Sequence, residues 1–167
     1  MGKEMKLIWK GDTRLGPELT DSMIELAEQR LGVKLPASYL KEMRQRNGGH
    51  LRTVYCPTTR KTDWGTNFIQ LRTVIGIGYP DGIDGPFGSK YMVAEWGYPD
   101  IGVLIADTPA GGHDAVMLDY RACGPTGEPS VAFIDEDRAV LPLAANFDSF
   151  VALLQESEPG SAVGVSA

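Results

Sequence analysis

The segment from Leu35 to Gly49 constrains the fold more tightly than any other part of the chain, because it contains both ends of a helix. Pro36 suits the first turn of a helix, where its fixed φ helps and its missing N–H costs no hydrogen bond. Residues at the spacing of one helical face follow it: Tyr39, Leu40, Met43 and Asn47. Gly48 can supply the left-handed residue that satisfies the last carbonyl groups, so we expect the helix to end there and a strand to follow.

A second helix is predicted directly upstream, over Asp21–Leu31. Thr20 is a residue type that caps helix N-termini, and Asp21 places a carboxylate near the positive end of the helix dipole. Gly32 follows the last periodic residue and ends the helix. The buried face is formed by Met23, Ile24, Ala27 and Leu31.

From Leu51 to Leu143 the pattern changes to short apolar runs separated by turns rich in Gly, Pro and Asp. Such runs indicate strands, and strands joined in series by short turns indicate antiparallel pairing, because parallel neighbours need crossover connections. The strands are predicted over Leu51–Cys56, Ile69–Ile75, Tyr91–Glu95, Gly102–Ala106, Ala115–Tyr120, Val131–Ile134 and Val140–Leu143, with a further short strand at Leu7–Trp9.

A last helix is predicted over Phe147–Glu156, capped by Asn146. The chain of 167 residues is therefore expected to form one α+β domain over residues 1–156, followed by a disordered tail at 157–167. Its core is a mainly antiparallel β-sheet of about six strands, flanked by two N-terminal helices and one C-terminal helix.

The leucine-proline-x-x-tyrosine start and Asn-Gly-Gly end of the first segment resemble the signature of the SUKH superfamily. Val74–Gly78 and the hairpin spanning 115–134 are similar to later blocks of that family, so the resemblance covers roughly residues 17–155. The superfamily includes fungal cell-wall-synthesis regulators, the bacterial Syd protein and many bacterial immunity proteins. It implies a scaffold that binds varied protein partners. The signature residues, expected to be structural, are Leu35, Pro36, Tyr39, Asn47, Gly48 and Gly49.

Charge is distributed unevenly along the chain. The net charge is −6, and residues 91–167 contain twelve acidic side chains against two basic ones, Arg121 and Arg138. An acidic half disfavours nucleic acid and favours a basic protein partner, although solubility alone is the simpler explanation. The residues predicted to bind the partner are Asp107, Asp114, Asp119, Glu128, Asp135, Glu136 and Asp137.

Other functional classes have weaker support in the sequence. The glycine-rich stretch 76–90 does not match a phosphate-binding loop, because Ser89 precedes Lys90 and a strand is predicted next. His113, Asp114 and Asp119 could hold a metal ion, but their spacing matches no ligand motif. We therefore expect no catalytic residue, cofactor or metal, and a metal-dependent enzyme built on those three residues remains the least favoured alternative.

Several aromatic residues stand beside glycine or proline in loop-like segments. Such residues more often pack beneath loops than anchor a partner, although tryptophan and tyrosine dominate interface energetics when they do. The residues concerned are Trp64, Phe87, Trp96 and Tyr98.

The combined features favour an immunity protein that neutralises a cognate nuclease-type toxin by masking it with an acidic surface. The class of partner comes from the family resemblance, and a regulatory or scaffolding protein that recruits a cellular partner is the alternative. Cys56 and Cys123 lie far apart without a CxxC spacing, which favours free thiols in the cytoplasm. No apolar run is long enough to span a membrane and the N-terminus lacks a secretory core, so no membrane association is expected.

Overall fold

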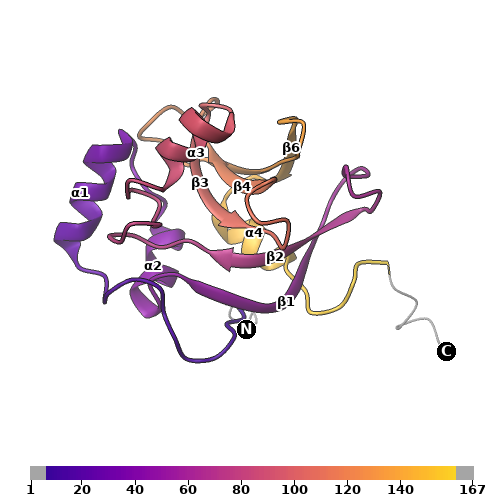
Figure 1. The fold of residues 1–167 in the computed structure, drawn as a ribbon, viewed down its shortest axis with the longest axis horizontal. Coiled ribbons are helices and arrows are strands. Elements are labelled where there is room, and N and C mark those ends of the chain that lie inside the picture. The colour runs from indigo at the N-terminus through magenta and orange to yellow at the C-terminus, as the bar shows by residue number, and fades with distance from the viewer. Residues whose placement is uncertain (1–6, 161–167) are drawn as a thin grey trace.

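The structure, a computed structural model, describes residues 7–160 and contains four helices and a six-stranded antiparallel sheet within that range (Figure 1). The elements in chain order are α1 (Asp21–Leu31), α2 (Ala37–Gln45), β1 (Gly49–Pro57), β2 (Phe68–Val74), α3 (Ser89–Trp96), β3 (Gly102–Asp107), β4 (Ala115–Asp119), β5 (Ser130–Ile134), β6 (Val140–Ala144) and α4 (Phe147–Leu153). The predicted α+β class, with two N-terminal helices and one C-terminal helix, is confirmed. The tail is predicted over residues 157–167, and residues 161–167 of it lie outside the described residues.

The strands follow one another across the sheet in chain order, each antiparallel to the next. The contact between β2 and β3 is short, because only Thr73 and Val74 of β2 pair with β3 before the chain leaves the sheet. On the side of β3 that faces β2, the backbone groups of Ile105 and Leu104 bond to residues outside the strands. The Ile75 amide donates to the Ile105 carbonyl over 2.8 Å, and the Leu104 amide donates to Ser89 Oγ over 2.9 Å.

Alternating residues of the central strands build a core on each face of the sheet. Val103 and Ile105 of β3 face the larger core together with residues of α2 and α4, where the rings of Tyr39 and Phe147 meet edge to face at 5.6 Å. Leu104, between them in the strand, faces a smaller core on the opposite side. That second core is completed by Met92 and Val93 of α3 and by Tyr98, Ala115, Met117 and Ile134.

The predicted strand at Tyr91–Glu95 is wrong, because this segment lies within α3. The β-branched and aromatic residues that suggested a strand are outweighed by tertiary context, which decides the conformation of many short apolar runs. The Ser89 hydroxyl anchors the first turn of the helix to β3, and Gly97 ends the helix with a left-handed φ of 72°. One premise for excluding a phosphate-binding loop therefore fails, whereas the order of Ser89 and Lys90 still departs from that motif.

The helix ends agree in part with the sequence. The bounds of α1 and its Thr20 and Gly32 caps are as predicted, and Asn146 caps α4 by accepting from the Ser149 amide. Gly48 has the expected left-handed φ of 79°, but α2 has already ended at Gln45 with Arg46 as its C-cap. The last helix is shorter than predicted, because it ends at Leu153.

Single bridges cover the outer edge of β1 at two points. Trp9 pairs with Leu51, which is all that remains of the strand predicted at Leu7–Trp9, and Gln155 pairs with Tyr55. At the second bridge the two residues exchange both backbone hydrogen bonds, at 2.8 and 3.0 Å. Among the described helices, none combines the length and apolarity that a membrane-spanning helix requires.

Candidate functional site

Asn47 of the predicted signature connects three segments of the chain through its buried side chain. Its Nδ2 atom donates to the carbonyl groups of Ile77 and Pro17 at 2.7 and 2.8 Å, and its Oδ1 atom accepts from the Ile77 amide at 2.8 Å. The residue is 1% exposed. Buried polar groups need such partners, so Asn47 holds the loop after β2 against the end of α2 and the lead-in to α1.

Neighbouring signature residues leave little free space around this contact. The Tyr39 hydroxyl donates to the Ile75 carbonyl over 2.5 Å, and burial raises the pKa of Tyr39, which keeps it protonated as a donor. A Cβ atom on Gly48 would lie 2.6 Å from the Tyr79 hydroxyl and 2.8 Å from the Gly76 amide. We call Tyr39, Asn47, Gly48, Gly76 and Tyr79 the Asn47 junction.

The remaining signature residues are buried as well. Leu35 and Pro36 precede α2, and the Leu35 amide donates to Glu28 of α1 over 2.7 Å. Gly49 begins β1, where a Cβ atom would lie 3.2 Å from the ring of Trp9. The signature therefore builds the scaffold and presents no surface to a partner.

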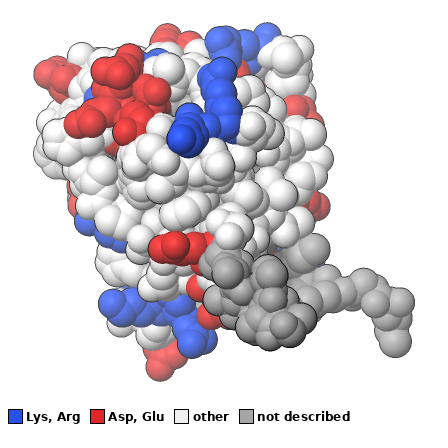
Figure 2. Space-filling view, turned by 90° about the vertical axis from the view of Figure 1, so that its right-hand side faces the viewer, with Lys and Arg blue, Asp and Glu red and all other residues white. Residues whose placement is uncertain are grey.

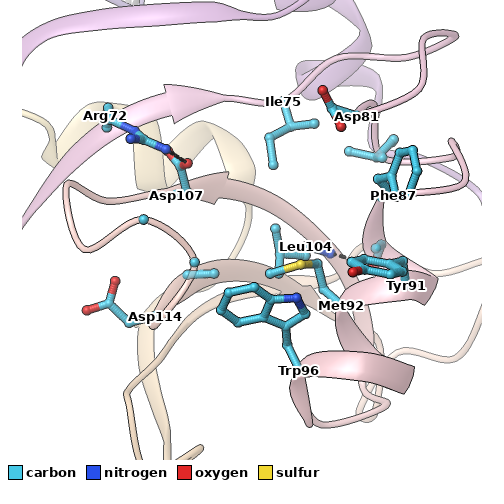
Figure 3. Close-up of a pocket in the computed structure, with 16 residues that line it drawn as sticks. Arg72, Ile75, Asp81, Phe87, Tyr91, Met92, Trp96, Leu104, Asp107 and Asp114 are labelled. Atoms are coloured by element: carbon cyan, nitrogen blue, oxygen red, sulfur yellow. Dashed lines mark hydrogen bonds and ion pairs between the residues drawn. The ribbon is translucent and has the colours of Figure 1, made fainter.

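A hollow with largely apolar walls lies elsewhere, on the face of the sheet that carries α3 (Figure 3). This apolar groove has a volume of about 370 Å³ and lies where β2 departs from β3. Its apolar walls come from the loop after β2, from β3 and from the region of α3. They are formed by Ile75, Ile83, Phe87, Tyr91, Met92, Trp96 and Leu104.

Helix α3 positions three of the large side chains of the groove, Tyr91, Met92 and Trp96. Ser89, Met92 and Trp96 are three and four residues apart, a spacing that puts them on one helical face. Phe87 precedes the helix and meets Tyr91 edge to face at 5.5 Å between ring centroids. Phe87 is 55% exposed and Trp96 is 39% exposed. The helix thus directs aromatic surface toward solvent at the groove.

The four aromatic residues noted in the sequence have different environments. Tyr98 is buried beneath the loop after β3, and its hydroxyl donates to the Gly112 carbonyl over 2.6 Å. Trp64 lies in the hairpin loop between β1 and β2, where its indole Nε1 donates to Asp114 over 2.8 Å. Packing beneath a loop therefore describes Tyr98, whereas Phe87 and Trp96 form exposed walls of the groove.

The charged residues that line the groove are mostly carboxylates. Asp107 is paired with Arg72, whose Nη2 atom lies 2.5 Å from Oδ2. Among the described lining residues Arg72 is the only cation, and Figure 3 shows it directed at Asp107. Asp81 is exposed at the margin and makes no ion pair within residues 7–160. Within that range, Asp81 is consequently the unpaired carboxylate at the margin of the groove.

Asp114 also lines the groove, but its carboxylate is directed away from the aromatic residues that form the groove walls (Figure 3). It is 1% exposed and accepts hydrogen bonds from the Thr108 hydroxyl and the Trp64 indole. Burial raises the pKa of Asp114, and these two hydrogen bonds partly oppose that rise. Its role is to hold two loops together, since little of it can reach a partner.

The predicted residues of the β5–β6 turn lie at the same end of the sheet as Asp107 and Asp114. Glu136 and Asp137 are exposed, and the Glu136 amide donates to Asp63 of the β1–β2 hairpin loop over 3.0 Å. Asp135 is less free, because its Oδ1 atom accepts from the Ala139 amide. We call residues 135–137 the acidic turn. Figure 2 faces the side on which the hairpin tip lies and shows acidic side chains gathered beside basic ones.

The other two predicted residues lie at the opposite end of the sheet. Asp119 ends β4 and pairs with Arg121 over 2.8 Å, a contact that holds the pKa of the Asp119 carboxyl below its usual value. Glu128 is exposed in the β4–β5 connection, and Ser130, two residues later, pairs with Asp119. The seven acidic residues therefore form two separate groups.

Arg138 connects the acidic turn to the groove through hydrogen bonds. Its guanidinium lies 4.0 Å from the centroid of the Tyr98 ring and donates to the carbonyl groups of Trp96, at 2.8 and 3.1 Å, and His113, at 2.7 Å. Its own φ is 68°, which is rare for a residue with a side chain. Arg138 has no predicted role, and an arginine directly after three acidic residues gives only a weak signal of this contact.

A basic hollow adjoins the groove across Arg72. Lys10, Arg52 and Arg72 line it on the exposed surface of β1 and β2. The Arg72–Asp107 pair therefore marks a boundary between an anionic and a cationic part of the surface.

The residues of the metal-enzyme alternative do not converge. Asp114 and Asp119 stand at opposite ends of β4, and the exposed His113 has its Nδ1 atom 3.9 Å from Glu136. Over residues 7–160, no group of three or more His, Cys, Asp and Glu side chains is arranged to hold a metal ion. The Cys56 thiol is buried, and burial raises its pKa to about 12, which leaves it a poor nucleophile.

Comparison with known proteins finds a matching family model. The model of the SMI1 / KNR4 family (SUKH-1) matches residues 18–153, which is most of the chain. No curated protein and no solved structure matches this chain. The matched range begins just before α1 and ends with α4, so it includes the Asn47 junction, the groove and the acidic turn.

Proposed function

The chain belongs to the SMI1 / KNR4 family (SUKH-1), and from that premise we propose that it is a non-catalytic module that binds another protein. The state of its polar groups supports this proposal. Arg72 is paired with Asp107, Asp114 is bonded to Thr108 and Trp64, and the Cys56 thiol is buried and protonated. A partner can bind to the exposed apolar and acidic surface without any of these groups being freed.

The more specific proposal is that the protein is an immunity protein, which neutralises a nuclease-type toxin by covering its basic surface. The observation that carries this proposal is the acidic turn, where Glu136 and Asp137 are exposed beside Asp63 at the same end of the sheet as the groove. A nuclease needs cationic surface to bind nucleic acid. A complementary anionic surface speeds encounter with such a protein and selects against anionic ones.

The test is a titration of the purified protein against the product of the toxin-like gene nearest to its own, with nuclease activity measured in parallel. We expect binding at micromolar concentration or tighter, accompanied by loss of nuclease activity. Binding without inhibition would support a regulatory or scaffolding role in the cytoplasm. No binding at micromolar concentration would contradict the immunity proposal.

A further inference from the structure

The walls of the apolar groove are large and exposed, as is usual for surfaces that a partner covers. Phe87 and Trp96 are 55% and 39% exposed, and Met92 lies between Leu104 and Trp96 in the groove (Figure 3). Aromatic side chains of this kind contribute most to binding when a partner excludes water from them. Singly exposed apolar residues need no explanation, but these line one continuous hollow.

The backbone of the groove is already satisfied, which limits how a partner can bind. β3 pairs with β4 at Leu104, but it has no strand neighbour on its other side there, because β2 has left the sheet. The Leu104 amide nevertheless donates to Ser89, and the Ile105 carbonyl accepts from Ile75. A partner therefore cannot extend the sheet here and must be recognised through its side chains.

At the margins of the groove away from Arg72 and the basic hollow, charge selects the chemistry of that partner. Asp81 is an exposed carboxylate at one margin, and the cation in the lining, Arg72, is neutralised by Asp107. Arg138 ties the acidic turn to the end of α3 by donating to Trp96 and to Asp135. A second copy of this chain, with a net charge of −6, is disfavoured because its own acidic surface would be repelled.

We propose that the apolar groove is the anchor site for the partner, and that it receives a large apolar side chain from a cationic segment of that protein. The inference rests on the proposed function and specifies which surface performs it. The aromatic walls bind the apolar side chain, while Asp81 and the acidic turn attract the neighbouring lysine or arginine residues.

The test begins with selection of a random decapeptide library, displayed on phage, against the full chain. We expect enriched peptides with an aromatic residue, leucine or methionine beside lysine or arginine. The absence of enrichment, or enrichment of acidic peptides, would overturn the proposal. Self-association would also overturn it. If the protein associates with itself as its concentration rises, and the measured affinity of the enriched peptide falls as a result, the groove is covered by a second copy.

Variants then locate the binding site of the enriched peptide. Phe87→Ala should weaken binding about tenfold, because it removes the exposed apolar surface of the ring that the partner would otherwise cover. The matched control is Leu15→Ala, which truncates an apolar side chain that is 39% exposed outside the groove and should leave binding unchanged. Phe87 is largely exposed, so its loss should leave the fold intact, and Trp96→Ala provides a second variant. Equal binding by wild type and both groove variants would refute the assignment.

Asp81→Asn tests the charge selection, with Asp12→Asn as the control at another exposed aspartate. We expect binding of the enriched peptide to weaken two- to threefold, with a shallower dependence on salt, only for Asp81→Asn. Failure of this proposal differs from failure of the proposed function. A toxin that binds wild type and Phe87→Ala equally would remove the groove alone, whereas groove-binding peptides without any toxin binding would remove the immunity role.

Discussion

Around Asn47 each polar atom of the side chain is bonded to backbone and no space remains, whereas around Trp96 large apolar surfaces face solvent. Both regions depend on the same loop after β2, which contributes Ile77 to the Asn47 junction and Ile75 to the groove. The junction fixes that loop from one side, so the groove on the other side has a defined shape. The residues that identify the family and the residues available to a partner are therefore different sets.

The strongest test of this division is Asn47→Ala, which removes the hydrogen bonds to Ile77 and Pro17. We expect a loss of about 3 kcal/mol in the free energy of unfolding, because each buried group left unpaired costs ~1–3 kcal/mol. Urea denaturation measures it. The control is Gln45→Ala, at the exposed last residue of α2, and it should change stability by less than about 0.5 kcal/mol. A change at Asn47 as small as the control would mean that the junction does not hold the loop.

A smaller loss is expected for Arg138→Ala, on the groove side of the comparison. The variant removes the stack on Tyr98 and the bonds to Trp96 and His113, at a cost of about 1–2 kcal/mol in the free energy of unfolding. Arg44→Ala deletes an exposed pair with Asp21 and should cost less than about 0.5 kcal/mol. If the two arginine variants were equally stable, the contacts of Arg138 would not stabilise the packing of the acidic turn against α3.

Charge reversal of the acidic turn should affect association and leave folding nearly unchanged. The structure favours Glu136→Lys with Asp137→Lys, because Asp135 accepts a hydrogen bond within the turn. We expect the association rate with the proposed toxin partner to fall about tenfold at low salt, with a weaker salt dependence. Stopped-flow kinetics measures this.

The control for that experiment is Glu18→Lys with Glu25→Lys, which makes the same change in net charge at two exposed positions near and within α1. It should slow association much less. Equal slowing by both double variants would mean that the partner responds to net charge and not to the acidic turn.

The smallest effects concern pH and the two carboxylates at the ends of β4. The pKa of Asp119 is lowered by Arg121, so its contribution to stability is present above the unfolded pKa of about 3.9 and is lost as pH falls through the folded value. The pKa of Asp114 is raised by burial, so its contribution is present below about 3.9 and is lost as pH rises through the folded value.

These signs predict opposite behaviour for two matched variants. From pH 3 to pH 7, wild type should gain stability relative to Asp119→Asn and lose stability relative to Asp114→Asn. Urea midpoints at the two pH values measure both differences. Screening by solvent makes the Asp119 effect small, because Arg121 is exposed. The same sign for both variants would contradict the assigned causes of the two shifts.

The scaffold was predictable where local rules and tertiary contacts agree. Thr20 and Gly32 bound α1 as their capping chemistry requires, and Asn146 does the same for the start of α4. Segment 89–96 was not predictable from its residue types, because contact with β3 decides its helical state. Gly97 after Trp96, with Met92 four residues earlier, was the available signal for a helix.

The site was less predictable than the fold, because exposure and pairing depend on residues distant in sequence. Asp114 and Asp119 looked equivalent to Glu136, yet one is bonded to Trp64 across 50 positions and the other is paired locally with Arg121. The sequence suggested Trp96 and Phe87 as aromatic residues outside periodic faces. It could not show that β2 departs from β3 beside them and leaves a groove.

The bridge between Tyr55 and Gln155 has a consequence for aggregation. β1 is an outermost strand, and such a strand offers unpaired amide and carbonyl groups to any other extended chain. Gln155 occupies these groups at Tyr55, Trp9 shields the strand near Leu51, and Pro142 removes a donor from β6 at the opposite edge. A chain that ends at Leu154 would expose the Tyr55 backbone. In concentrated solution its β1 strands should then pair edge to edge between molecules and cause aggregation.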